Sequence, residues 1–127
     1  MSTSIVVRDP LTSAAAWIGG SGRPYTELVI ESNQNKWARQ GTPCGITCTL
    51  AQNVRIQIRY DYDGNHGFHV DAYKNEQHRV YVWEGNRAGT NVAIADYTRA
   101  LEHMNNTYIS GGQESVATAF LSGRREI

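Results

Sequence analysis

Residues 53–84 of this chain read NVRIQIRYDYDGNHGFHVDAYKNEQHRVYVWE, and this stretch decides the fold. Apolar and polar residues alternate from Val54 to Tyr62, a period of two that is typical of a strand with one face on a core. The glycine-containing segment 63–67 predicts a first turn, and the polar segment 74–77 predicts a second. The stretch therefore predicts three antiparallel strands in a twisted meander, with one face rich in Arg, His, Asp and aromatic residues.

The first turn also predicts a register between its two strands. If it centres near Asn65, Asp61 lies across from His69, and Ile58 lies across from Ala72. Polar residues then pair with polar residues on one face, and apolar residues pair with apolar residues on the other.

The flanking sequence predicts further strands and helices. Segments 4–8, 25–31 and 46–50 are typical of short strands, and segment 11–18, LTSAAAWI, has the composition of two helical turns that stop at Gly19.

The C-terminal part changes to the helical period. Apolar residues recur at three- and four-residue steps from Ile94 to Met104, which predicts an amphipathic helix with Thr90 or Asn91 as its N-cap. Segment 110–123 predicts a second helix that ends at a glycine. We therefore expect an α+β fold, a twisted antiparallel meander followed by two C-terminal helices, as a single domain over residues 1–127.

Composition narrows the classes of partner. The 127 residues include 12 basic and 12 acidic side chains, so the formal net charge is zero and a nucleic acid polymer is not expected as the partner. The N-terminus lacks the pattern of a secretory signal, and no stretch is long and apolar enough to span a bilayer. We expect a cytoplasmic protein.

The two cysteines, Cys44 and Cys48, predict free thiols. On an extended segment they lie roughly 13 Å apart, at about 3.3 Å per residue, which is too far for a disulfide. Reduced, partly buried side chains are the expected state in a cytosolic protein.

The segment around His69 contains possible metal ligands. His69 and Asp71 share a face of their strand, but His66 lies in the turn and has to reach back to join them. A solvated hairpin with a cross-strand pair between Asp61 and His69 is the favoured interpretation, so no metal site and no cofactor are predicted.

Two enzyme classes remain as alternatives. A thiol-dependent effector, in the manner of the glutamine deamidase toxins, would use Cys48 as nucleophile and His69 as base. A metal-free ribonuclease would draw its acid, base and phosphate-holding groups from the following residues: Glu76, His69, His78, Arg59 and Arg79. A plain protein-interaction module is a third class that fits the neutral charge.

The binding of a phosphate-bearing nucleotide uses more of the sequence. A glycine-rich loop, 18–22, precedes a basic residue, and arginines follow the second C-terminal helix. Tyr81 and Trp83 share the polar side of the third strand and offer rings for a base, although Trp83 could equally pack beneath the helices. The candidate ligand-binding residues are Arg23, Tyr81, Trp83, Asn86, Asn91, Arg99, Arg124 and Arg125.

The plan of the whole chain, an antiparallel sheet followed by two short helices, resembles the phage Thoeris anti-defence proteins of the first type. The resemblance lies in architecture and not in a motif, so no family residue is transferred. It implies an oligomeric sponge that binds cyclic ADP-ribose isomers or cyclic oligonucleotides without degrading them, and so counteracts bacterial anti-phage immunity. From the aromatic residues Tyr73, Tyr81 and Trp83, taken as exposed, we also expect a homo-oligomer.

Overall fold

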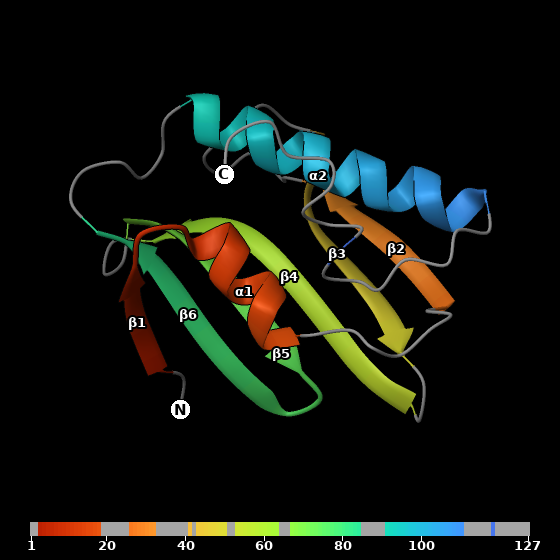
Figure 1. Cartoon of the computed structure of the whole chain (residues 1–127), viewed down its shortest axis with the longest axis horizontal. Helices are drawn as coiled ribbons and strands as arrows, with labels where there is room; N and C mark the ends of the chain where they lie inside the picture. Colours follow the sequence, from red (N-terminus) through yellow and green to blue (C-terminus); the bar gives the residue numbers. More distant parts are fainter. Residues whose placement is uncertain are drawn as a thin grey trace.

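The computed structural model describes residues 3–18, 26–32, 41, 43–50, 53–63, 67–84, 91–110 and 118. Within these residues it shows the expected α+β fold, drawn in Figure 1. The elements in chain order are β1 (Thr3–Val7), α1 (Pro10–Ile18), β2 (Thr26–Ser32), β3 (Pro43–Leu50), β4 (Val54–Asp63), β5 (Gly67–Lys74), β6 (Gln77–Trp83) and α2 (Asn91–Ile109).

The strands form one six-stranded sheet in the order β1-β6-β5-β4-β3-β2. Four of its neighbouring pairs are antiparallel, and β1 pairs with β6 in parallel (Figure 1). The meander predicted from β4 to β6 is confirmed. The parallel position of β1 was not predicted, because it depends on a contact between strands that are distant in the sequence.

The predicted register of the first hairpin is confirmed. Asp61 pairs with His69 and Ile58 pairs with Ala72 in the β4–β5 ladder. Because side chains alternate between faces along a strand, this register assigns every residue of the two strands to one face or the other.

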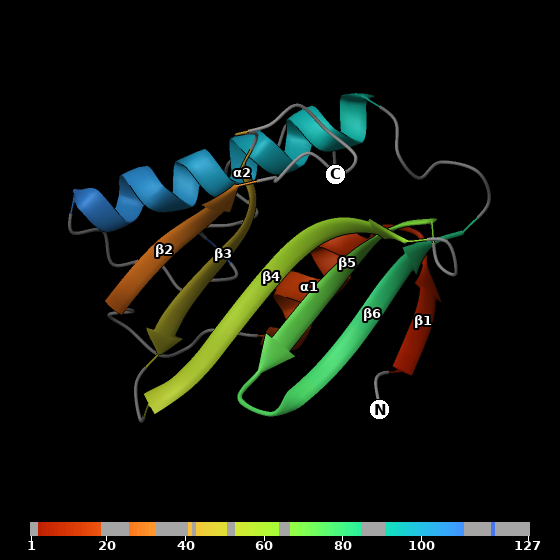
Figure 2. The same cartoon turned by 180° about the vertical axis from the view of Figure 1, so that it is seen from behind.

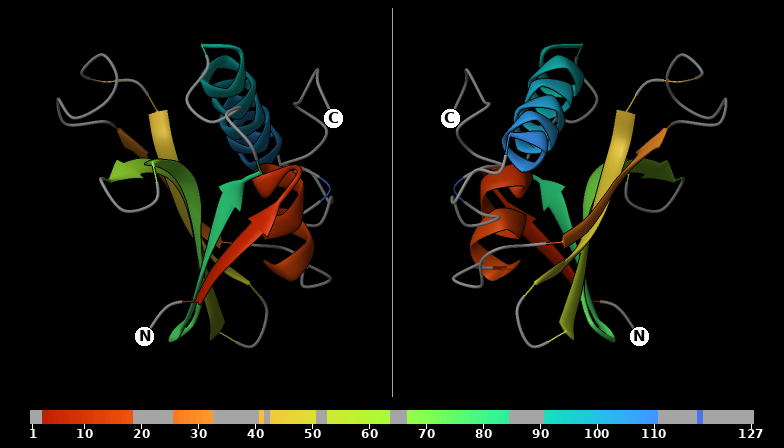
Figure 3. Two further views of the ribbon diagram at one scale, coloured as in Figure 1. Left: turned by 90° about the vertical axis from the view of Figure 1, so that its left-hand side faces the viewer. Right: turned by 90° about the vertical axis from the view of Figure 1, so that its right-hand side faces the viewer.

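Both helices described by the structure lie on the same face of the curved sheet, as Figure 3 shows from two sides. Helix α1 packs against β5 and β6, and α2 packs against β2 and β3. We call this the helix-covered face. It holds a continuous hydrophobic core whose sheet residues include Ile46, Ile56, Ile58, Tyr60, Val70 and Ala72.

Helix α1 starts at a cap that the sequence supplies. The Asp9 carboxylate accepts hydrogen bonds from the Thr12 amide at 3.3 Å and from the Thr12 hydroxyl at 2.9 Å. Pro10 occupies the first helical position, where its missing amide hydrogen costs nothing. Leu11, Ala14 and Ile18 are buried, so the short helix is held mainly by its contact with the sheet.

Helix α2 confirms the first of the two predicted C-terminal helices. Tyr97, Leu101 and Met104, which carried the prediction, are almost completely buried. The second predicted helix, 110–123, lies outside the described residues except for its first residue and for Thr118, which is helical. Among the described helices, none has the length and apolar character needed to cross a membrane.

One hydrogen bond ties α2 to the centre of the sheet. The Tyr97 hydroxyl donates to the Ile58 carbonyl oxygen of β4 at 2.8 Å, and both groups are buried. Burial raises the pKa of Tyr97 well above its ordinary value, so the hydroxyl keeps its proton.

Replacing Tyr97 with Phe removes this donor and keeps the ring in the core. We expect Tyr97→Phe to lower the free energy of unfolding by roughly 1–2 kcal/mol, because one buried hydrogen bond is lost. Urea unfolding measures the change, and an unaltered slope with denaturant shows that the same surface unfolds. An unchanged midpoint would mean that the hydrogen bond does not contribute.

Candidate functional site

The sheet face opposite the helices carries a group of polar and charged side chains, which we call the polar face. Figure 2 shows the sheet from this side, with β4, β5 and β6 in front of α1. The strand registers place the following residues on it: Glu31, Gln57, Arg59, Asp61, His69, Asp71, Tyr73 and His78. They come from β2, β4, β5 and β6.

Asp71 lies at the centre of this group and contacts two histidines. His69 Nε2 is 3.2 Å from Asp71 Oδ2, and His78 Nε2 is 2.9 Å from Asp71 Oδ1. Because an ionised carboxylate only accepts hydrogen bonds, both imidazoles donate from Nε2. The His78 ring stacks on the Tyr73 ring with centroids 4.0 Å apart and planes at 7°, which fixes its orientation.

Asp61 completes a set of possible metal ligands. One ligand atom from each of Asp61, His69 and Asp71 lies within 4.8 Å of the other two. Tetrahedral ligands at about 2.0–2.1 Å from a zinc ion are roughly 3.4 Å apart, so a small side-chain rotation brings all three to one ion. His69 is only 3% exposed, and Asp61 and Asp71 are partly buried.

The electrostatics of Asp71 favour the form that a metal needs. Burial works against ionisation of this carboxyl group, but the hydrogen bonds and charges of His69 and His78 outweigh burial and lower its pKa. The carboxylate is therefore ionised at neutral pH. A metal ligand must be deprotonated, and Asp71 already is.

Arg59 is the basic side chain beside this cluster. It pairs directly with Asp71 in the β4–β5 register, its Nη2 lies 3.7 Å from Asp61 Oδ2, and its Nε lies 3.4 Å from Glu31 Oε1. Glu31 in turn accepts a hydrogen bond from Gln57 at 2.5 Å. The guanidinium thus lies between two carboxylates.

Gly45 of β3 allows Arg59 and Glu31 to lie close to the sheet. A Cβ atom built on Gly45 would lie 2.9 Å from Arg59 Cγ, 3.0 Å from Glu31 Oε1 and 3.1 Å from the Ile58 carbonyl oxygen. A side chain at this position would meet the backbone of β4 as well as the ion pair.

We expect Gly45→Ala to destabilise the protein by about 1–3 kcal/mol, because the added methyl group overpacks a site where backbone limits movement. Urea unfolding measures this loss. Thr47→Ala is the matched control, since Thr47 lies two residues further on the same strand and face and its change removes atoms. Equal midpoints for Gly45→Ala and the unaltered protein would contradict the close approach.

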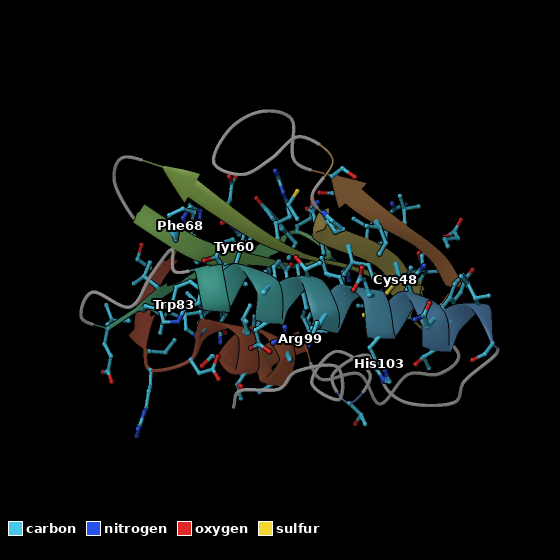
Figure 4. All side chains as sticks on the ribbon, turned by 90° about the horizontal axis from the view of Figure 1, so that it is seen from above. Cys48, Tyr60, Phe68, Trp83, Arg99 and His103 are labelled. Atoms are coloured by element: carbon cyan, nitrogen blue, oxygen red, sulfur yellow. The ribbon has the colours of Figure 1, made fainter. Side chains whose placement is uncertain are left out.

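The residues predicted to bind a nucleotide are not brought together in the described part of the chain. Tyr81 and Trp83 lie on the helix-covered face, where Tyr81 is 3% exposed, so the expected polar side is wrong for both and the alternative of packing beneath the helices is confirmed for Trp83. Figure 4 shows Trp83 with Tyr60 and Phe68, and the Tyr60 ring centroid is 5.6 Å from that of Trp83.

The remaining candidates contribute little to a site among the described residues. Arg99 lies 3.5 Å from the buried carboxylate of Asp96 on the same helix, and Asn91 is the first residue of α2. The other four, Arg23, Asn86, Arg124 and Arg125, lie outside the described residues. Tyr73, Tyr81 and Trp83 are buried or half-buried, so the exposed aromatic surface from which a homo-oligomer was expected is not observed at these residues.

The thiol-dependent alternative does not fit the structure. Cys48 lies in the core of the helix-covered face and His69 lies on the polar face, so the sheet separates them. Burial raises the pKa of Cys48 to about 12, which keeps it protonated. Both cysteines are free and buried, as predicted.

The ribonuclease set is also divided. His69, His78 and Arg59 share the polar face, but Arg79 lies over the Trp17 ring of α1 at 4.6 Å on the other face. Glu76 is exposed in the turn between β5 and β6.

The thiol of Cys48 should be inert in the folded protein. With a pKa of about 12, only about 10⁻⁴ of the thiol is ionised at pH 8, compared with about a quarter of an ordinary cysteine. We expect the Cys44→Ser variant, which retains Cys48, to react with Ellman's reagent only as fast as the protein unfolds. Rapid reaction in native buffer, matching the rate in urea, would contradict the burial.

No protein-family model, curated protein or solved structure matches this chain. The resemblance to the Thoeris anti-defence proteins therefore stays a hypothesis.

Sequence reasoning missed Asp61 as a third ligand. It tested His69 and Asp71 with His66, because those residues are close in sequence. The signal was present in the predicted cross-strand pair of Asp61 with His69. Asp71 lies two residues after His69 on the same face of its strand, so this pair places two carboxylates beside one imidazole.

Proposed function

We propose that the protein binds a divalent transition-metal ion through Asp61, His69 and Asp71. The observation that carries the proposal is the convergence of one imidazole and two carboxylates, with ligand atoms within 4.8 Å of one another, from two strands in register. A rigid sheet supports all three side chains, which favours a site that is formed before the ion arrives.

The charge around the cluster supports a cation as the ligand. Among the described residues, the carboxylates of Glu31, Asp61 and Asp71 lie around the guanidinium of Arg59, and with neutral imidazoles these four side chains sum to a formal charge of −2. An anion on its own would be repelled here, whereas a divalent cation would neutralise the cluster.

The donor set suits ions that accept both nitrogen and oxygen. Zn²⁺, Mn²⁺ and Co²⁺ bind imidazole and carboxylate together, while Mg²⁺ and Ca²⁺ prefer oxygen alone. His78 would act from outside the coordination sphere, because its hydrogen bond to Asp71 Oδ1 orients the carboxylate toward the ion. Three protein ligands leave at least one coordination position for another molecule, as in catalytic zinc sites.

Isothermal titration of Zn²⁺ and Mn²⁺ into the chelator-treated protein tests the proposal. We expect His69→Gln to raise the Kd of the preferred ion by more than about 100-fold, because the substitution removes the nitrogen ligand. Loss of a ligand should cost more affinity than the change of an outer-sphere residue. His103→Gln is the matched control, because His103 lies on α2, away from the polar face (Figure 4). A thermal shift with the ion should follow the same order.

Two results would contradict the metal site. One is the lack of a specific heat of binding for either ion in the unaltered protein. The other is an equal loss of affinity in His69→Gln and His103→Gln, which would place the ion elsewhere.

A further inference from the structure

We propose that the metal-loaded centre binds a phosphate-bearing anion between the ion and Arg59. This inference rests on the proposed metal site. It assigns the open coordination position a ligand class, and it makes the protein's affinity for that ligand dependent on the metal.

Arg59 lies at the border of the proposed metal site. It faces Asp71 across the β4–β5 ladder, and its guanidinium approaches Asp61 at 3.7 Å, so it borders two of the three metal ligands. Its side chain is 32% exposed, so the guanidinium also reaches solvent. Any molecule on the open side of the metal lies next to this group.

A metal ion and Arg59 would compete for the Asp61 carboxylate. In the metal-free protein, the Arg59 guanidinium lies 3.7 Å from the Asp61 carboxylate. An ion that coordinates Asp61 takes over this role and leaves Arg59 with Glu31 as its carboxylate partner. A guanidinium has five N–H donors, so Arg59 has donors beyond the Nε that lies beside Glu31.

Metal binding would also change the charge of the cluster. With neutral imidazoles, the three carboxylates and one guanidinium described here sum to a formal charge of −2 without metal, and a divalent ion brings this sum to zero. The carboxylates then no longer repel an anion, and the metal ion and the Arg59 guanidinium lie next to each other as its two possible partners. An anion should therefore bind more tightly to the loaded protein than to the metal-free protein.

The geometry selects the class of anion. A ligand that bridges a metal ion and a guanidinium needs oxygen acceptors that point in different directions, and a phosphate group presents them. Divalent ions also bind phosphate oxygens directly. The base of a nucleotide is not required by this arrangement, so the phosphate should supply most of the affinity.

ADP and Co²⁺ are the probes. ADP is titrated into the Co²⁺-loaded and the metal-free protein by calorimetry, with adenosine as the ligand that lacks phosphate. The visible spectrum of the bound Co²⁺ reports directly on a change in its ligands. We expect ADP to bind at least about tenfold more tightly to the loaded protein and to shift the spectrum, and adenosine to do neither.

Arg59→Gln separates this inference from a merely structural role. It should weaken ADP binding to the loaded protein by about tenfold or more, while Co²⁺ affinity stays equal or increases, because a competing cation is gone. Arg55→Gln is the matched control: Arg55 is an exposed arginine on the same strand and face and should change neither affinity. Arg59→Lys keeps the charge without the fork and serves if Arg59→Gln does not fold.

The outcomes are distinguishable. Failure of the unaltered protein to bind Co²⁺ overturns both proposals. If Co²⁺ binds but ADP binds equally with and without it, or equally to Arg59→Gln and the unaltered protein, the metal site stands and the anion site is overturned. Equal binding of adenosine and ADP would also overturn it.

Discussion

The register between β4 and β5 is the constraint on which the rest of this structure depends. It places Ile58 opposite Ala72 and Tyr60 opposite Val70 on the helix-covered face, and in the same step it places Asp61 opposite His69 and Arg59 opposite Asp71 on the polar face. A slip of one residue would turn the hydrophobic set outward and scatter the polar cluster. The energy of the core therefore maintains the geometry of the site, even though the two lie on opposite faces.

Part of this arrangement could be predicted from the sequence, and the limit has a physical cause. The alternation in β4 and the glycine-containing turn were sufficient for the register of the first hairpin. In β6 they were not, because Val80 and Val82 alternate with Tyr81 and Trp83, so both faces of that strand are apolar. Only its pairing with β5 and β1 decides that the aromatic side faces the helices.

The site was harder to predict for a related reason. A metal centre is usually sought among residues that are close in sequence, but Asp61 and His69 meet only across a hairpin. The thiol hypothesis failed in the same way, because the order of Cys48 and His69 along the chain does not show that a sheet separates them. Both outcomes depend on the face of the sheet, which pairing fixes and local composition does not.

The metal-free cluster is already a stable arrangement, and this bears on how an ion would enter. Both Asp71 oxygens accept hydrogen bonds from imidazoles, and Arg59 lies beside Asp61, so the buried charges have partners without an ion. Because a neutral His69 that donates from Nε2 carries its single ring proton there, a metal at that nitrogen requires the proton to move to Nδ1. Binding then exchanges the hydrogen bond between His69 and Asp71 and one arginine contact for an ion, with little movement of the backbone. Such a preformed site has its affinity set by that exchange, which is why a change at Arg59 should alter metal and anion binding in different directions.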